Sequence, residues 1–252
     1  MKKTKIDWCD CTLNPVIGCK NDCPYCYARK INKRFKFIEN WNKPQFFPER
    51  LDQLKSKKPK SIFMDSMSDV GWWNLEWIKK TAKAIKQNPQ HNYLFLTKRP
   101  DLFIEKCKSI EEASNGNVFI GTTISRRCEI QRVWNLPAFL PHFISIEPIL
   151  EDFGDISNTD LVSTTMGMGS TIIIGAETGN RKDKVIPKKE WILNIVDAVN
   201  KANDEYIDLF GSEKAEKHNR KIKIFMKESL REIMGEDFRQ DQLIWEVKSD
   251  TT

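Results

Sequence analysis

The stretch "NYLFLTKRPDLFIEKCKSIEEASNGNVFIGTTI", residues 92–124, decides the fold. Its two ends, 92–98 and 117–124, are short runs rich in aromatic and β-branched residues, as is typical of buried strands. Between them, residues 99–110 have a helical pattern in which Pro100 suits the first turn. A strand, a helix and a second strand in this order predict a βαβ unit, whose two strands run parallel.

The same alternation continues on both sides of this unit. Further strands are predicted at 61–66, 142–148, 170–177 and 222–228, with a weaker one at 11–18, where Pro15 interrupts. Helical patterns cover 26–37, 73–87, 126–136 and 187–203. We therefore predict an α/β fold with a mostly parallel sheet, and this number of units fits either a barrel-like sheet or an open doubly wound one.

Nothing in the sequence divides the chain into separate domains. There is no internal repeat and no linker, so we predict a single domain over residues 1–252. The polar stretches 151–170 and 204–221 are expected to be loop insertions, and a short extension should follow the last strand.

The composition is that of a soluble protein, with 40% hydrophobic and 30% charged residues. No apolar run is long enough to suggest a membrane span, and no apolar stretch follows the basic start, so we expect a cytoplasmic protein without membrane association. Residues 1–60 carry 15 Lys and Arg against 6 Asp and Glu. This basic segment suits an anionic partner such as nucleic acid or a nucleotide, although solubilising surface lysines would give the same count.

Most of the predicted strands end in polar residues. In parallel α/β folds ligands bind at the carboxyl ends of the strands, so these residues should share one polar mouth. Strand ends are commonly solvent-exposed and polar, which explains any single position equally well. The prediction depends on the presence of polar residues at the ends of several strands. The residues concerned are Ser66, Ser68 and Asp69; Thr97 and Lys98; Thr122, Thr123 and Ser125; Glu147; Glu177; and Lys227 and Glu228.

Three cysteines, Cys19, Cys23 and Cys26, stand within eight residues of each other. In a reducing compartment such clustering indicates metal or redox chemistry more than disulfides. A structural zinc normally takes four ligands, and no histidine lies nearby, although Cys9 and Cys11 could contribute. A [4Fe–4S] cluster bound by three thiolates would leave one iron open to an outside ligand, which is the logic of a catalytic metal site. The remaining Cys107 and Cys128 fall in predicted helices and are expected to be buried thiols.

The spacing of the triplet, with three residues and then two between cysteines, resembles the signature of the radical S-adenosylmethionine (radical SAM) enzymes. The segments "KIDWCDCTLNPVIGCKNDCPYCYA", "DSMSD", "LFLTKRP", "FISIEP", "IIIGAETG" and "IFMKE" also occur in the order seen in a phage-associated family of radical-SAM-like proteins of largely unassigned function. This resemblance runs from about Ile6 to Glu228, nearly the whole chain.

The resemblance implies a partial (βα)6 barrel and a defined chemistry. Cys19, Cys23 and Cys26 would ligate three irons of a [4Fe–4S] cluster, and S-adenosylmethionine (SAM) would bind the fourth. Reductive cleavage of SAM would give a 5′-deoxyadenosyl radical that takes a hydrogen atom from the substrate. A reductase or a flavodoxin-type protein would be the electron donor.

The resemblance also suggests roles for the polar residues. Where the superfamily often carries a Gly-Gly-Glu motif that holds the SAM amino group, this chain has "DSMSD", so Ser66, Ser68 and Asp69 are candidates for that contact. Other candidate SAM contacts are Lys98, Thr123 and Ser125, with Tyr25 or Tyr27 near the adenine. Glu147, Glu177 and Lys227 are left as catalytic candidates that would contact substrate or SAM.

The substrate is expected to be a nucleobase or nucleotide that the enzyme modifies or repairs. The basic segment and the phage-type resemblance motivate this expectation. Residues 30–47 interleave basic and aromatic residues, which is consistent with nucleic-acid contact and equally with an amphipathic helix whose aromatics pack inward. Of the adjacent Trp72 and Trp73, only one can face the core, and the other is expected near the site mouth. The alternative function is a non-enzymatic nucleic-acid-binding protein with a structural zinc at the triplet.

Overall fold

The parallel sheet expected from the alternating pattern is present in the computed structural model, which describes residues 2–157, 161, 170–212 and 221–246. Its strands lie in the order β1-β2-β5-β6-β7-β8-β9-β10, and every neighbouring pair is parallel except β1 with β2. The short strands β3 and β4 form a separate antiparallel pair. The strands are β1 (Lys2–Lys3), β2 (Cys11–Thr12), β3 (Val16–Ile17), β4 (Gln45–Phe46), β5 (Ser61–Phe63), β6 (Asn92–Thr97), β7 (Val118–Thr123), β8 (His142–Ile146), β9 (Thr171–Ile174) and β10 (Lys223–Met226).

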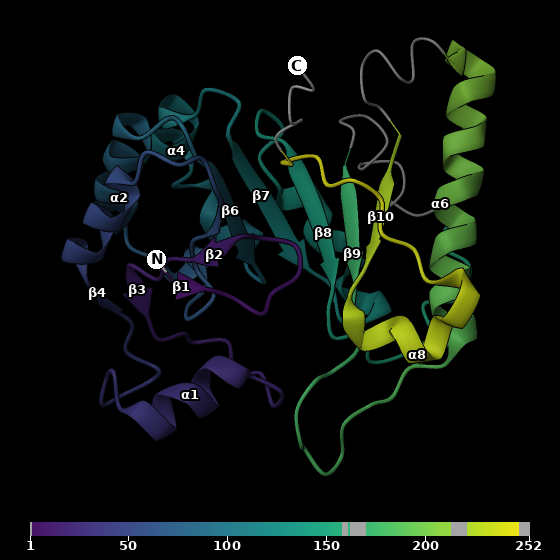
Figure 1. The fold of residues 1–252 in the computed structure, drawn as a ribbon, viewed down its shortest axis with the longest axis horizontal. Coiled ribbons are helices and arrows are strands. Elements are labelled where there is room, and N and C mark those ends of the chain that lie inside the picture. The colour runs from purple at the N-terminus through teal and green to yellow at the C-terminus, as the bar shows by residue number, and fades with distance from the viewer. Residues whose placement is uncertain (1, 158–160, 162–169, 213–220, 247–252) are drawn as a thin grey trace.

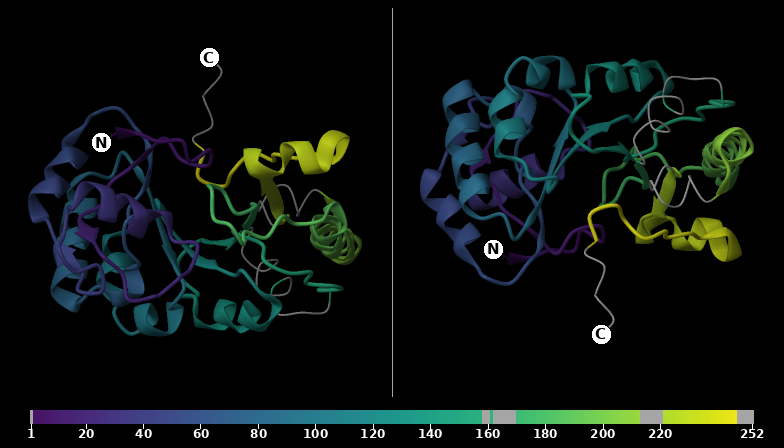
Figure 2. Two further views of the ribbon diagram at one scale, coloured as in Figure 1. Left: turned by 90° about the horizontal axis from the view of Figure 1, so that it is seen from below. Right: turned by 90° about the horizontal axis from the view of Figure 1, so that it is seen from above.

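The sheet curls into a half-barrel, and helices cover its outer face (Figures 1 and 2). The α-helices are α1 (Tyr27–Phe35), α2 (Leu75–Gln87), α3 (Pro100–Ile104), α4 (Lys108–Ala113), α6 (Lys189–Phe210) and α8 (Arg231–Met234). The 3₁₀ helices are η1 (Pro48–Lys55), η2 (Val70–Trp72), η3 (Arg127–Asn135), η4 (Glu228–Leu230) and η5 (Gly235–Asp237).

Alternate residues of each strand point to opposite faces, which gives the sheet one apolar core on each face. The larger core joins the outer face of the sheet to the helices, for example Ile120 and Ile144 to Ile78 of α2 and Ile195 of α6. The smaller core fills the inside of the half-barrel with Phe63, Leu94, Phe119, Phe143, Ile173 and Phe225, joined by Trp8 and Trp245. The interior is therefore packed with aromatic side chains and is not an open channel.

Two tryptophans from opposite ends of the chain pack into this interior. Trp245 Nε1 donates to the carbonyl oxygen of Trp8 at 2.9 Å, and the ring centroids of Trp245 and Phe143 are 5.0 Å apart. The extension predicted after the last strand thus returns to the barrel and completes its inner core.

Several predicted elements differ from those observed. Residues 99–110 form α3 and α4 in place of one helix, and the turn between them lets Lys106 Nζ donate to the carbonyl oxygens of Gly71 and Trp73. The segment 126–136 is the 3₁₀ helix η3, where Cys128 is exposed, so the prediction of a buried thiol is wrong there. Cys107 is buried as expected.

The other differences lie at element ends. The weak strand predicted at 11–18 is split into β2 and β3, because Pro15 has no N–H to donate to a neighbouring strand. The carbonyl oxygen of Pro15 accepts a hydrogen bond from Phe47 N. Helix α6 runs to Phe210, beyond the predicted end at 203, and stops at Gly211, whose φ of 84° is unfavourable for other residues. The two expected insertions, 151–170 and 204–221, are described only in part. The residues of these insertions that lie outside the described ones are 158–160, 162–169 and 213–220.

No helix in the described ranges is both long enough and apolar enough to cross a membrane.

Candidate functional site

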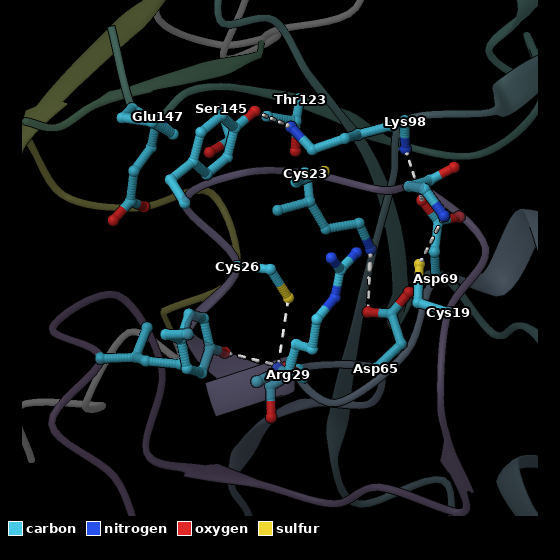
Figure 3. A pocket seen from close by; sticks show the side chains of 18 of the residues that line it. Cys19, Cys23, Cys26, Arg29, Asp65, Asp69, Lys98, Thr123, Ser145 and Glu147 are labelled. Atoms are coloured by element: carbon cyan, nitrogen blue, oxygen red, sulfur yellow. Dashed lines mark hydrogen bonds between the residues drawn. The ribbon is translucent and has the colours of Figure 1, made fainter. Parts of the chain in front are cut away.

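A cavity of about 210 Å³ opens at the carboxyl ends of the parallel strands. Its lining comes from the ends of β5 to β10, from the loop that carries the three cysteines, and from the first turn of α1 (Figure 3). This is the edge at which parallel α/β folds bind their ligands. The predicted site residues in the lining are Cys19, Cys23, Cys26, Tyr25, Ser66, Ser68, Asp69, Lys98, Thr123, Glu147, Glu177 and Lys227.

The cysteine loop is fixed at both ends by local structure. At its start Gly18 has a φ of 106°, and a Cβ there would lie 2.8 Å from the carbonyl oxygen of Trp41, so only glycine fits. At its end Cys26 is the N-cap of α1, and its Sγ accepts from Arg29 N at 3.3 Å. Cys19 Sγ accepts from Asn21 N at 3.4 Å. Two of the three sulfurs therefore receive backbone N–H groups, as metal-bound thiolates commonly do.

All three thiols are free and partly exposed toward the cavity. Burial raises the pKa of Cys19 and Cys23, and the nearby charge of Asp69 raises that of Cys19 further. The charge of Lys98 lowers the pKa of Cys23 in part, and a bound metal would lower the pKa of both thiols further.

The chemistry of the three side chains fits an iron–sulfur cluster, since cysteine thiolates are the ligands that hold such clusters. Within the described residues, no group of three His, Cys, Asp or Glu side chains is arranged to hold one metal ion.

Asp69 was predicted to contact a cofactor, but its carboxylate is already fully engaged. Oδ1 accepts from Gly71 N at 2.9 Å and from Thr97 Oγ1 at 2.5 Å. Oδ2 accepts from Lys98 N at 2.9 Å and from Asn21 Nδ2 of the cysteine loop. Asp69 therefore ties the cysteine loop to the ends of β5 and β6.

The two serines beside Asp69 also have partners in the chain. Ser66 Oγ donates to Asn14 Oδ1 at 3.1 Å, and Ser68 Oγ accepts from Trp73 Nε1 at 3.1 Å. The serines line the cavity, but their hydroxyl groups hold neighbouring segments in place.

Tyr25, Lys98 and Ser125 meet at one point behind the cysteine loop. The Tyr25 hydroxyl lies 3.0 Å from both Lys98 Nζ and Ser125 Oγ. Tyr25 and Lys98 reach the cavity, whereas Ser125 lines a neighbouring groove together with them and Cys23. Of the residues predicted to share the polar mouth, four are absent from the cavity lining: Ser125, Thr97, Thr122 and Glu228.

The far wall of the cavity is built from ion pairs. Lys227 Nζ lies 2.5 Å from Glu147 Oε1 and 4.0 Å from Asp7 Oδ1. Gly175 makes room for this contact, since a Cβ there would lie 3.0 Å from Lys227 Cδ and 3.1 Å from Glu147 Cγ.

Glu177, beside this wall, is held by both of its oxygens. It accepts from Arg181 Nε at 2.6 Å and from Arg181 NH2 at 2.7 Å. These hydrogen bonds hold the pKa of Glu177 below its usual value.

The site also contains residues that the sequence did not single out. Asp65 follows β5, is buried in the lining, and has a pKa raised well above its usual value by burial and by Asp69. Ser145 is in β8, two residues before Glu147, which follows the strand. Because side chains alternate along a strand, the sequence could have predicted that Ser145 lies on the same face as Glu147. Ser145 Oγ and the Nε1 atoms of Trp8 and Trp41 line the cavity without a hydrogen-bond partner among the described residues.

Of the adjacent tryptophans, one faces the core as expected, and the other, Trp72, is not part of the cavity lining. Trp73 is buried, while Trp72 lies near the cysteine loop, between Lys20 and Arg99, whose charged groups are 5.3 Å and 4.9 Å from its ring centroid. Trp72 Nε1 donates to Asn21 Oδ1 at 2.6 Å. Trp72 thus braces the cysteine loop from outside.

Solved structures with the same architecture come from spore photoproduct lyase. Two structures of a Cys-to-Ala mutant, one of them with dinucleoside spore photoproduct, superpose with a TM-score of 0.57 at 10% identity, covering 90% of this chain and 79% of that one. A Tyr-to-Phe mutant gives a TM-score of 0.56 at 10% identity, covering 88% of this chain and 78% of that one. The mostly parallel α/β half-barrel therefore has the same fold as spore photoproduct lyase, which confirms the predicted fold class.

Sequence comparison adds one curated relative and a family. An uncharacterized protein, MJ0683, from Methanocaldococcus jannaschii is 29% identical over 124 residues, which span 48% of this chain and 47% of the relative. The match thus spans about half the length of that relative, and it does not bear on the expected phage association. The family model described as "Protein of unknown function (DUF5131)" matches residues 3–240. Because this match covers nearly the whole chain, the protein belongs to the DUF5131 family.

Proposed function

We propose that this protein is a radical SAM enzyme that modifies or repairs a nucleobase or nucleotide. The observation that carries the proposal is the set of three free thiols, Cys19, Cys23 and Cys26, on one wall of a cavity at the carboxyl ends of the parallel strands. The likeness of the fold to spore photoproduct lyase supports it.

The cysteine triplet would hold a [4Fe–4S] cluster, and SAM would bind in the cavity beside it. When bound, the cluster supplies the electron for reductive cleavage of SAM to a 5′-deoxyadenosyl radical. Tyr25, Lys98 and Thr123 border the space next to the thiols and are the proposed SAM contacts, with Ser66 and Ser68. The chain's contribution is to hold the cluster loop rigidly, through Asp69 and Asn21, and to line the site with apolar side chains.

The opposite wall is the proposed substrate side. Glu147, Lys227 and Glu177 offer both signs of charge, and Ser145 Oγ has no hydrogen-bond partner among the described residues. Donors and acceptors close together suit the edge of a nucleobase, which presents both. The dinucleoside in one spore photoproduct lyase structure is a ligand of this chemical class.

The electron donor is proposed to be a reductase or a flavodoxin-type protein. Cys23 borders both the cavity and the neighbouring groove that contains Arg99, Arg126 and Arg132. A donor approaching from the groove would come close to the cluster without entering the substrate side.

Anaerobic reconstitution tests the proposal. Protein loaded with iron and sulfide is mixed with SAM and dithionite, and 5′-deoxyadenosine is measured by chromatography. We expect 5′-deoxyadenosine from the wild type and from Cys128→Ala, whose thiol is exposed and lies outside the cavity lining, and none from Cys23→Ala. A wild-type protein that carries the cluster but yields no 5′-deoxyadenosine would contradict the proposal.

A further inference from the structure

Two segments of the chain project beside the mouth of the cavity. One is α1 with its C-terminal turn, residues 27–37, and the other is the segment 179–188 between β9 and α6 (Figure 1). Both are continuous with the cavity lining, through Tyr27 and Arg29 on one side and Glu177 and Thr178 on the other.

Helix α1 lies near the residues that lead into the other segment. Hydrogen bonds from Arg181 hold the pKa of Glu177, two residues before that segment, below its usual value, and the charge of Lys30 on α1 adds to this effect. A ligand in the cavity would therefore lie next to the residues from which both segments extend.

Both segments carry exposed cations in excess. In α1 and its turn these are Lys30, Lys33, Arg34 and Lys36, and in the other segment Lys182, Lys184 and Lys188. None of them forms an ion pair with another described residue, whereas Arg29 and Arg181 are paired with Asp22 and Glu177. The acidic residues within or next to the segments are Asp22, Glu39, Glu177, Asp183 and Glu190.

The same surface carries exposed apolar side chains. Tyr27, Ile31 and Phe35 recur every four residues along α1, so they form one stripe that leads about 12 Å outward from the cavity. The Phe35 ring, 58% exposed, lies 5.9 Å from that of Phe37 at an interplanar angle of 28°. Ile186 is 69% exposed on the opposite segment. The aromatic residues at 35 and 37 therefore face solvent, whereas Trp41 of the same stretch is buried. Inward packing, one of the two alternatives for residues 30–47, thus applies to Trp41 and not to Phe35 and Phe37.

We propose that α1 and the segment 179–188 bind the phosphate backbone of a single-stranded or locally opened polynucleotide, one base of which enters the cavity. The inference rests on the proposed function and narrows its substrate from nucleotides in general to nucleic acid. Unpaired cations beside exposed aromatic rings are the combination by which proteins bind single strands, because the cations attract phosphates and the rings stack on bases. A free nucleotide would fill the cavity and leave this surface unused.

Fluorescence anisotropy with a short labelled single-stranded oligonucleotide, in DNA and RNA versions of one sequence, tests the inference. The variant Lys30→Glu with Arg34→Glu reverses two charges four residues apart on α1. Its matched control is Lys79→Glu with Lys83→Glu, which makes the same change on exposed positions of α2, a helix outside the cavity lining. Circular dichroism and thermal melting establish that both variants are folded.

We expect the α1 variant to bind the oligonucleotide about tenfold more weakly or worse at about 0.1 M salt, with the log–log salt slope reduced by about 1.4. Lys182→Glu with Lys184→Glu should do the same, and the α2 control should bind like the wild type. Whichever of DNA and RNA binds more tightly identifies the source of the polynucleotide.

Three results would overturn the inference. The first is an α2 control that binds the oligonucleotide as weakly as the α1 variant does. The second is a wild-type protein that binds a nucleoside monophosphate as tightly as the oligonucleotide. The third is an α1 variant that no longer binds phosphatidylserine vesicles but still binds the oligonucleotide. Oligonucleotide binding is measured independently of SAM cleavage. A protein that cleaves SAM but does not bind the oligonucleotide would therefore reject this inference alone. A protein that binds the oligonucleotide but does not cleave SAM would reject the proposed function alone.

Discussion

At the scale of single residues, Asp69 shows how far sequence reasoning reaches into this site. Its position after a strand predicted that it would lie at the mouth, and it does. Its role could not be predicted, because three of its four donors come from Asn21, Thr97 and Lys98, which only the fold brings next to it. Strand ends can be read from a sequence, whereas hydrogen-bond partners across a sheet cannot.

Replacing Asp69 by Ala should lower the free energy of unfolding by about 2–4 kcal/mol, because four donors at a buried site lose their acceptor. Iron content after reconstitution should fall as well, since the cysteine loop loses its tie to the sheet. Urea denaturation measures the first effect. Glu112→Ala, which removes an exposed carboxylate facing Lys108, is the control and should leave the midpoint unchanged. An Asp69→Ala midpoint equal to that of the wild type would show that these hydrogen bonds contribute little.

Cys23→Ala should remain folded, with a melting temperature close to that of the wild type, while losing bound iron. The reason is that the two apolar cores hold the half-barrel together without any contribution from the triplet. Cys128→Ala should keep both properties. Unfolding of Cys23→Ala in a melting experiment would favour the alternative of a structural zinc, whose binding energy is folding energy.

At the scale of elements, strongly periodic segments were predictable and their boundaries were not. Helix α2 was expected from its apolar spacing, and Asn74 begins it by accepting from Trp77 N at 2.9 Å. Of the apolar residues at helical spacing in α2, Leu75 is exposed, whereas Ile78, Ala82 and Ile85 are buried. The first turn of a helix can extend past the sheet that it covers, and spacing alone does not show where the sheet ends.

Ile78 and Leu75 give a matched pair on α2. Ile78→Ala should lower the free energy of unfolding by about 2–5 kcal/mol, because Ile78 is fully buried in the larger core. Leu75→Ala should change it by less than about 0.5 kcal/mol. Both values come from urea denaturation, and similar losses for the two variants would mean that α2 packs on a different face.

At the scale of the whole molecule, the βαβ alternation predicted the parallel sheet. It did not decide whether the sheet curls into a barrel or stays open. The half-barrel follows from its inner core, which joins Trp8 and Trp245 from the two ends of the chain to side chains of the central strands. Such contacts between distant parts of the chain leave no periodic signal in the sequence.

Gly121 tests whether this interior is closely packed. A Cβ on Gly121 would lie 2.6 Å from the ring of Phe143, so Gly121→Ala should cost about 1–3 kcal/mol of stability. Phe143→Leu in the same chain should recover part of that loss by making room for the added methyl group. Additive losses in the double variant, measured by urea denaturation, would indicate that the two positions do not share space.

The central claim is that the cysteine triplet carries a cluster with one iron open to SAM. The most direct test is the metal and sulfide content of the protein purified without oxygen. We expect about four irons and about four sulfides per chain. About one zinc per chain with no sulfide would contradict it.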